Sequence, residues 1–324
     1  MRVPSLPAMH DILSGAAGII ATVRFNIYVG NHNAASRDLC LHLQKSLESG
    51  GQQATASEKL VPGECNILIE NFGPKLVERA IDLAFAGTPI IVWGSEEITG
   101  ETFNTGVADE HPHYGDREVW KLRFDNFLTV AEHATAIWVP TETLPPAYRE
   151  AVPGVTVQVF PHGYAQGYPE LAQRPEAQKD IDFYFSGSNT EHRRDLLEHL
   201  AARHRVVTHH YEVSEETRRA YLSRAKVCLS LRLGPQTRMA SVTRMHALIM
   251  NRCYTLHEQC PLPSHLDACV EHVRWEDLPQ ACEAALAMPD RRERANAMLE
   301  RLKRDLPMKE IVPKLLDEAF ASGR

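Results

Sequence analysis

The sequence predicts an α/β protein that contains two parallel sheets. Short runs rich in β-branched and aromatic residues alternate with amphipathic segments along the whole chain. These runs are apolar throughout rather than at every second residue, which is typical of parallel strands covered by helices on both faces. The alternation starts again after a segment rich in Pro and Gln at 165–180, and 324 residues suffice for about two domains.

The first half alternates strands and helices in a regular order. The stretch "RFNIYVG" (24–30) predicts a buried strand because it is apolar and ends in glycine. A helix over 31–51 follows, since leucines recur every four residues and two glycines end the segment. The other predicted strands of this half are 65–71, 88–94, 135–140 and 155–163, and the other helices are 74–87, 125–134 and 141–152.

The second half repeats the same order after the segment at 165–180. Its first strand is "IDFYFSG" (181–187), which ends abruptly in a turn of small residues. The remaining predicted strands are 205–210, 226–233 and 252–258, and the helices are 190–204, 214–225, 241–251, 275–288 and 290–306. Ligands of such folds bind outside the carboxyl ends of the strands, so the space between the two halves is the expected site.

Charge and composition exclude several classes of function. The net charge is -7 and the pI about 6.1, which argues against nucleic acid as a partner. The apolar stretch "GAAGIIATV" is much shorter than the roughly 20 residues of a membrane span, and no basic segment precedes it as in a signal peptide. We therefore expect a cytoplasmic protein. The seven cysteines form no CxxC pair, and we predict no metal site.

The turn after the strand at 181–187 is a candidate phosphate site. Gly187, Ser188 and Asn189 are small, and the helix that follows offers unpaired N–H groups at its N-terminus. Arg193 adds positive charge in the first turn of that helix. The alternative is an ordinary tight turn with a Ser or Thr cap and a solvated arginine pair, and the sequence leaves both interpretations open.

Three further arginines recur every six residues beyond the strand at 226–233. Arg232 ends the strand, Arg238 lies in the loop, and Arg244 falls in the first turn of the helix at 241–251. A cation there would lie near an anion at the helix N-terminus, and arginine suits phosphate. The alternative is a salt-bridged surface.

Three stretches together resemble GT-B glycosyltransferases. They are "AEHATAIWVPTETLPPAY", "VQVFPHGY" and "KVCLSLRLGPQTRMASVTRMHALIMNRCYTLHE". The turn "YFSGSNTEHRR" is similar to that of the CgeB-like branch, next to the group 1 glycosyltransferases. The resemblance implies two Rossmann-like domains whose sheets face each other across a cleft. Residues 1–163 would bind the acceptor and residues 164–306 the nucleotide-sugar donor, with a last helix at 307–324 packing back on the first domain.

The chain departs from the family pattern in the donor region. The two glutamates of the E-x7-E motif correspond to Arg238 and His246, and a glycine of the family corresponds to Asn251. By position, His246 would bind the donor ribose, and asparagine can adopt the left-handed conformation of the missing glycine. Glu258, which ends the strand at 252–258, completes the predicted donor set.

The resemblance also implies candidates in the first domain. An inverting enzyme needs a general base at the end of a strand facing the cleft, and we expect Glu97 or Asp109 in that role. The alternative for Glu96 and Glu97 is a helix cap. Gly30, Asn31 and His32 follow the first strand and are candidates for acceptor binding, although a plain turn with an asparagine cap fits equally well.

The function implied is transfer of a sugar from a nucleotide-activated donor, without a metal or cofactor. The acceptor is open between a glycan, a lipid, a protein and a small molecule, and peripheral membrane contact is open as well. Two alternatives remain: a nucleotide-sugar epimerase with the same fold, and a nucleotide-sugar binding protein that has lost its catalytic glutamates.

Overall fold

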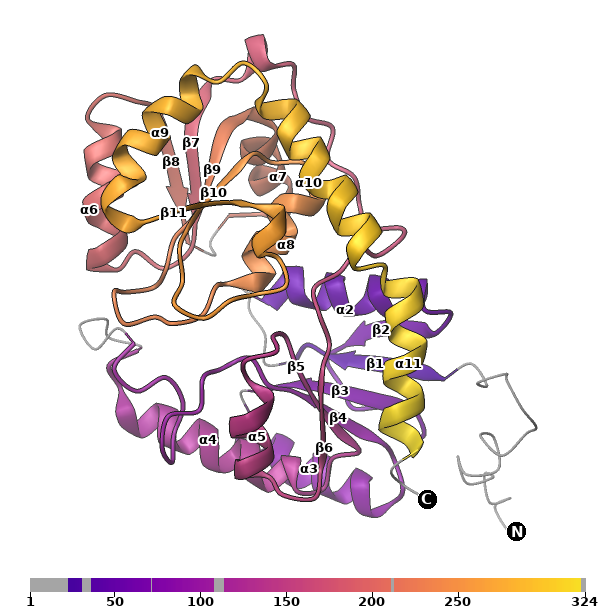
Figure 1. Cartoon of the computed structure of the whole chain (residues 1–324). Helices are drawn as coiled ribbons and strands as arrows, with labels where there is room; N and C mark the ends of the chain where they lie inside the picture. Colours follow the sequence, from indigo (N-terminus) through magenta and orange to yellow (C-terminus); the bar gives the residue numbers. More distant parts are fainter. Residues whose placement is uncertain (1–22, 31–35, 71, 108–113, 211–212, 322–324) are drawn as a thin grey trace.

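The structure confirms an α/β fold with two parallel sheets, one in each half of the chain. The computed structural model describes residues 23–30, 36–70, 72–107, 114–210 and 213–321. The two sheets form two domains, one above the other in Figure 1. Every strand pairing in both sheets is parallel, as uninterrupted apolar runs predict.

The first domain holds a six-stranded sheet in the order β2-β1-β3-β4-β5-β6. Its strands are β1 (Arg24–Tyr28), β2 (Gln53–Ser57), β3 (Cys65–Ile69), β4 (Ile90–Trp93), β5 (Ala136–Val139) and β6 (Thr156–Val159). Its helices are α2 (Arg37–Ser49), α3 (Pro74–Phe85), α4 (Arg117–Ala131) and α5 (Pro145–Ala151). On β3, Ile67 and Ile69 pack under α2, whereas Leu68 packs on the opposite side under α3 and α4. Burial on both faces explains why three consecutive residues of the strand, Ile67 to Ile69, are apolar.

The second domain holds a five-stranded sheet in the order β11-β10-β9-β7-β8. Its strands are β7 (Ile181–Ser186), β8 (Val206–His209), β9 (Ala225–Ser230), β10 (Thr255–Glu258) and β11 (Glu271–Val273). Its helices are α6 (Glu191–Ala201), α7 (Glu215–Arg224), α8 (Val242–Met250), α9 (Leu278–Ala287) and α10 (Arg291–Asp305). Helices α6 and α9 cover one face, and α7 and α8 contribute to the core on the other.

The structure corrects three details of the sequence prediction. Strands β2 and β11 were not predicted, and α4 begins at Arg117 instead of at residue 125. The left-handed residue after α8 is also not the expected one. Asn251 has a φ of -89°, and the following residue, Arg252, has a φ of 54°.

The chain crosses between the domains twice, and the two crossings are bonded to each other. Tyr164 lies in the first crossing, and its N–H donates to Leu306 O at 2.8 Å. Its carbonyl accepts from the N–H of Met308, at 2.9 Å, where the last helix α11 (Met308–Ala321) begins. From there α11 runs along the first domain beside α2, as Figure 1 shows, and buries Val312 in the core beneath α2. The two connections therefore form one narrow junction.

Ion pairs join the domains beside this junction. Arg218 of α7 donates to both carboxylate oxygens of Asp38 on α2, at 2.8 and 2.6 Å. Arg37 donates to Glu215, at 3.0 Å, in the same region. These contacts hold α2 against α7. The carboxyl ends of the two sheets face each other across the cleft between the domains.

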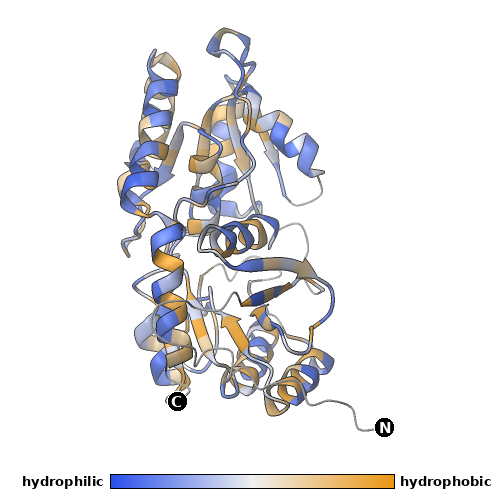
Figure 2. Cartoon of the chain, turned by 90° about the vertical axis from the view of Figure 1, so that its right-hand side faces the viewer, coloured by the Kyte–Doolittle hydropathy of each residue, from blue (hydrophilic) through white to orange (hydrophobic). Residues whose placement is uncertain are grey.

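Hydropathy follows this architecture. Figure 2 shows orange, hydrophobic strands inside the first domain and helices that are orange on one side and blue on the other. Within the described part of the chain, no helix has both the length and the apolar character that crossing a bilayer would require.

A substitution of Gly50, at the end of α2, tests whether α11 packs against this helix. A Cβ added to Gly50 would lie 2.5 Å from Cγ1 of Val312 and 2.6 Å from its Cβ, so α11 would have to move. Gly50 has a φ of -81°, which alanine adopts freely, so the effect is steric alone. We expect Gly50→Ala to lower the free energy of unfolding by about 1–3 kcal/mol, as overpacking does, in urea titrations.

Gly73→Ala is the matched control. Gly73 has a φ of -79°, and no heavy atom lies within 4 Å of its added Cβ. Equal stability of the two variants would mean that α11 does not pack against α2 as described.

Candidate functional site

A cavity of about 220 Å³ lies between the two domains. On the side of the first domain it is lined by residues 95–97, directly after β4, and by Asn104, Val107 and Tyr114. On the side of the second domain it is lined by the turn before α6 and by the loop between β9 and α8. The cavity thus lies at the carboxyl ends of strands of both sheets, where ligands of parallel sheets bind.

Five of the fourteen predicted site residues line this cavity: Glu97, Ser188, Arg193, Arg232 and Arg244. Among the described residues, three arginines and two glutamates line it, and Ser188 contributes a hydroxyl. The charged residues are Arg193, Arg232, Arg244, Glu96 and Glu97. The excess of positive charge in this lining contrasts with the net charge of -7 of the whole chain.

Arg193 fixes the two loops of the second domain. Only 3% of its surface is exposed. It donates to Ser188 O at 2.9 Å, to Leu231 O at 2.9 Å and to Arg232 O at 2.7 Å. These bonds join the turn after β7 to the loop after β9, so this arginine positions the backbone that lines the cavity.

Gly187 leaves room for a second arginine. Its φ is 147°, and a Cβ there would lie 2.7 Å from Nη2 of Arg244 and 3.2 Å from the ring of Phe185. The guanidinium of Arg244 lies 5.2 Å from the centre of the same ring and donates to Leu231 O at 3.2 Å. The glycine is therefore needed both for its backbone conformation and for the place that Arg244 occupies.

The N-terminus of α6 has no side-chain cap. The hydroxyl of Thr190, the N-cap residue, donates instead to Leu233 O at 2.6 Å, across to the loop after β9. N–H groups at the start of α6 are thus left for water or a ligand, next to Ser188 in the cavity lining. Asn189, between the two, is exposed and does not line the cavity.

Glu258 lies behind the cavity and holds Arg232. The glutamate is fully buried and accepts from the Arg232 side chain at 2.6 Å and from its backbone N–H at 2.8 Å. His192 completes the cluster, 2.9 Å from the same carboxylate. Burial raises the pKa of Glu258, but the hydrogen bonds from His192 and Arg232 outweigh it, and the pKa is lowered. Glu258 is therefore a carboxylate whose charge is matched within the protein.

Glu97 meets a residue of the opposite domain. Its carboxylate accepts from Nη1 of Arg238 at 2.9 Å, and its N–H donates to the side chain of Asn104 at 3.1 Å. The side chain of Arg238 is 58% exposed and that of Glu97 only 17%. Two residues predicted for separate roles, base and donor binding, thus form one ion pair across the cleft.

Glu70 is a residue of this region that the sequence did not single out. It follows β3 and is 3% exposed. One carboxyl oxygen accepts from the N–H and the hydroxyl of Ser95, at 2.6 and 2.7 Å, and from the N–H of Glu96, at 3.0 Å. Glu70 therefore holds the loop that carries Glu97.

The protonation of Glu70 follows from its surroundings. Burial, and then the neighbouring carboxylate of Glu96, raise its pKa to about 8 against the opposing effect of Arg123 and Ser95. The second carboxyl oxygen lies 3.2 Å from the hydroxyl of Tyr148, which also lies 2.9 Å from Glu96 O. When Tyr148 donates to Glu96 O, a protonated Glu70 can donate to Tyr148, so the neutral form is fully bonded.

His246 does not line the cavity. It is fully buried, and its Nε2 lies 2.9 Å from Gly163 O in the first crossing between the domains. The ring packs against His42 and Tyr168, with centroids 4.5 and 5.6 Å away. Burial lowers the pKa of His246 to about 4, so the ring is neutral near pH 7. The structure thus places His246 at the junction of the domains, and its contact with a donor ribose stays a prediction.

The remaining predicted residues lie apart. Gly30 borders Tyr28 and Glu58, whose hydroxyl and carbonyl would lie 2.5 and 3.0 Å from an added Cβ. Asn31, His32 and Asp109 lie outside the described residues. In the part of the chain that is described, no group of three or more His, Cys, Asp or Glu residues is placed to hold a metal ion.

Comparison with solved structures identifies the architecture. A structure of S. aureus TarM in complex with Fondaparinux, α-GlcNAc-glycerol and UDP matches at a TM-score of 0.50 and 11% identity, over 78% of this chain and 55% of TarM. The N-terminal domain of Candida albicans trehalose-6-phosphate phosphatase matches at 0.50 and 9%, over 95% and 99%. The fold is GT-B. The chain spans about half the length of TarM.

This chain resembles the two solved structures in fold alone. No protein-family model and no curated protein sequence matches this chain. The cavity between the domains, with the loops after β4, β7 and β9 around it, is thus a feature of this chain's own structure.

The raised pKa of Glu70 predicts how stability depends on pH. Between about pH 4.5 and 8 Glu70 is protonated in the folded protein and ionised in the unfolded chain, so folding takes up a proton. The stabilisation by the neutral carboxyl is complete below about 4.5 and is lost as the pH rises through about 8. Compared with Glu70→Gln, the wild type should lose up to about 1.4 kcal/mol of unfolding free energy per pH unit in this window.

Urea titrations at pH 5, 6, 7 and 8 measure this difference. Glu78→Gln, at an exposed position of α3, is the control and should leave the pH dependence of the wild type unchanged. A stability difference between wild type and Glu70→Gln that is constant over this range would contradict the protonated state.

Proposed function

We propose that this protein is a glycosyltransferase that takes its sugar from a nucleotide-activated donor. The carrying observation is the placement of Arg244 beside Gly187, at the edge of a cavity between two domains of GT-B fold. Arginine side chains and the N-termini of α6 and α8 would neutralise the leaving diphosphate, so the reaction would need no metal. The S. aureus TarM structure of the same fold contains UDP, which supports a nucleotide as the ligand.

We infer a division of labour between the domains. Residues 164–306 would bind the donor, because the arginines lie on their side of the cavity. Residues 1–163, with the helix at 307–324, would bind the acceptor and supply the base. Gly30, Asn31 and His32 remain candidates for acceptor contacts. We also propose the relationship to the CgeB-like branch, on the strength of the turn "YFSGSNTEHRR".

Glu97 is our candidate for the general base among the described residues. It lines the cavity from the first domain, opposite Arg232 and Arg244. A base must reach the acceptor hydroxyl while the leaving group is stabilised from the other side, and this arrangement allows both. Its ion pair with Arg238 orients the carboxylate toward the second domain.

The two alternatives differ in what they require of this cavity. An epimerase needs several acid–base groups around one sugar, and among the described lining residues the carboxylates are Glu96 and Glu97 alone. A binding protein needs none, and the pairing of Glu97 with Arg238 would be enough to close the cavity over a nucleotide sugar.

Arg244→Gln tests the donor site. We expect it to weaken the binding of a nucleoside diphosphate by about tenfold to a hundredfold, because it removes a charge-assisted hydrogen bond to phosphate. Calorimetry with UDP, GDP and dTDP first identifies the nucleotide, and the variant is then titrated with the one that binds. Glutamine can still donate to Leu231 O, so folding should be retained.

Arg194→Gln is the matched control, since Arg194 is exposed on α6 and lies outside the cavity lining. It should bind the nucleotide as the wild type does. If no nucleotide bound the wild type, or if Arg244→Gln bound with unchanged affinity, the donor site would not be where we place it.

Glu97→Gln tests catalysis separately from binding. We expect the rate of donor consumption to fall by about a hundredfold or more, as for loss of a general base, with little change in nucleotide affinity. The measurement follows release of nucleotide from the sugar nucleotide that binds, with water or an added acceptor. Glu101→Gln is the control, because Glu101 is exposed in the same loop and does not line the cavity.

The outcomes separate the hypotheses. Binding without any consumption by the wild type would favour the binding protein, and conversion of the donor into an epimer would favour the epimerase. Full activity of Glu97→Gln would remove this residue as the base and leave Asp109 as the candidate.

A further inference from the structure

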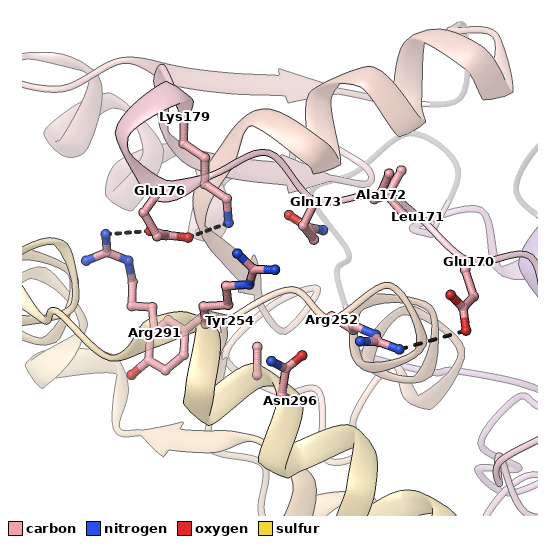
Figure 3. Close-up of a pocket in the computed structure, with 12 residues that line it drawn as sticks. Glu170, Leu171, Ala172, Gln173, Glu176, Lys179, Arg252, Tyr254, Arg291 and Asn296 are labelled. Carbon is pink, nitrogen blue, oxygen red and sulfur yellow. Dashed lines mark hydrogen bonds and ion pairs between the residues drawn. The ribbon is translucent and has the colours of Figure 1, made fainter.

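A second cavity, of about 320 Å³, lies in the second domain away from the cleft. It is formed by the segment at 170–179 that joins the domains, by α10, and by Arg252 just beyond α8 (Figure 3). It shares no lining residue with the cavity between the domains, and none of the residues predicted from the sequence lines it. The proposed nucleotide-sugar site therefore does not account for this cavity.

The lining of this cavity is rich in positive charge. It contains four cations and two carboxylates, in a chain whose net charge is -7. The cations are Lys179, Arg252, Arg291 and Arg292, and the carboxylates are Glu170 and Glu176. An excess of cations in a recess of an acidic protein favours an anionic ligand.

Two of the cations share one carboxylate. Lys179 and Arg291 approach Glu176 from opposite sides (Figure 3), each at 2.8 Å. Their side chains are only 6% and 9% exposed. Arg291 also donates to three carbonyl groups at the end of α9, which offset its charge further. Among the described residues Lys179 pairs only with Glu176, which it shares, and a charge withdrawn from water is costly unless an opposite charge compensates it.

The other two cations are even less compensated. Arg252 lies 3.8 Å from Glu170, whose side chain is 85% exposed, so solvent screens this pair strongly. Arg292 has no carboxylate at ion-pair distance within the described ranges. Arg252 also has a φ of 54°, an uncommon conformation for arginine that places its side chain in this lining.

Uncharged groups of the lining indicate what else the ligand carries. The amide of Gln173 donates to Asn251 O at 2.8 Å, whereas its Oε1 is buried without a hydrogen-bond partner. A buried acceptor of this kind calls for a donor such as a hydroxyl. Tyr254 is 3% exposed and its hydroxyl donates to Glu271, so its ring offers no free face on which a nucleobase could stack.

We propose that this cavity binds a small phosphate monoester that bears hydroxyl groups, of the size of a hexose phosphate. A volume of about 320 Å³ is at the lower end of the range for small-molecule sites. The phosphate lies among Lys179, Arg252 and Arg292, where guanidinium groups can form paired hydrogen bonds to its oxygens. A ligand hydroxyl donates to Gln173. This site is separate from the nucleotide-sugar site and does not depend on it.

Calorimetry on the full chain tests the site with three probes: a hexose 6-phosphate, inorganic phosphate and the neutral hexose. We expect the hexose 6-phosphate to bind, inorganic phosphate to bind more weakly, and the hexose not to bind. Arg252→Asn and Arg292→Gln should each weaken binding of the hexose 6-phosphate by about tenfold, because each removes one charge from the phosphate contacts. Asparagine at 252 keeps the left-handed backbone conformation, which it tolerates better than most residues.

Two further variants locate the binding. Arg174→Gln changes the same charge on the same segment at an exposed position outside the lining, and should bind as the wild type does. Arg244→Gln should also leave this binding unchanged, since it lies at the other cavity. Thermal unfolding of each variant shows whether it is folded. If either Arg252→Asn or Arg292→Gln fails to fold, the other still tests the site.

Several results would overturn the proposal. They are the absence of binding by both phosphate probes, unchanged affinity in Arg252→Asn and Arg292→Gln, and loss of binding in Arg244→Gln. Binding of the neutral hexose as tightly as the hexose 6-phosphate would also overturn the assignment of a phosphate monoester. Because a failure of nucleotide binding affects only the other cavity, the two proposals fail independently.

Discussion

The three hydrogen bonds of Arg193 are the constraint on which the second half of the cleft depends. A buried guanidinium that donates to Ser188 O, Leu231 O and Arg232 O ties the turn after β7 to the loop after β9. These bonds satisfy backbone carbonyls inside the protein, where a polar group left without a partner is costly. The ring of Phe185 contacts both Arg193 and Arg244. The position of Arg244 in the cavity therefore depends on the same residues as that of Arg193.

The sequence predicted the interior strands better than the edges of the sheets. A strand buried on both faces, such as β3 ("CNILI") or β9 ("AKVCLS"), has consecutive apolar residues and stands out in the sequence. Edge strands are less constrained: β2 reads "QATAS" and β11 only "EHV", and most of their residues are at least partly exposed. The start of α4 was missed because charged residues dominate its first two turns, although Trp120 and Phe124 are buried four residues apart.

The candidate site could be predicted only where it depends on local chain order. The turn after β7 follows its strand directly, and α8 is the next helix after β9, so the sequence could single out Gly187, Ser188 and Arg244 as candidates. On the first-domain side of the cavity, the contacts that hold the loop after β4 depend on which strands are neighbours in the sheet. Glu70 reaches Ser95 because β3 pairs with β4, and no periodicity along the chain reveals that contact. Arg193 was predicted as a phosphate ligand, whereas the structure gives it a positioning role that only the folded loops disclose.

The ion pairs between the domains indicate on which side the cleft can open. Asp38 and Arg218, beside the junction, are joined by two hydrogen bonds, and their side chains are 19% and 15% exposed. The pair between Glu97 and Arg238 has one hydrogen bond and an arginine that is 58% exposed. Exposed pairs contribute about 0–1 kcal/mol, whereas bidentate, partly buried ones contribute more. The contact across the cleft is thus the weaker of the two. Opening there would keep the junction at Tyr164 intact, free the carboxylate of Glu97 and admit a ligand to the arginines opposite.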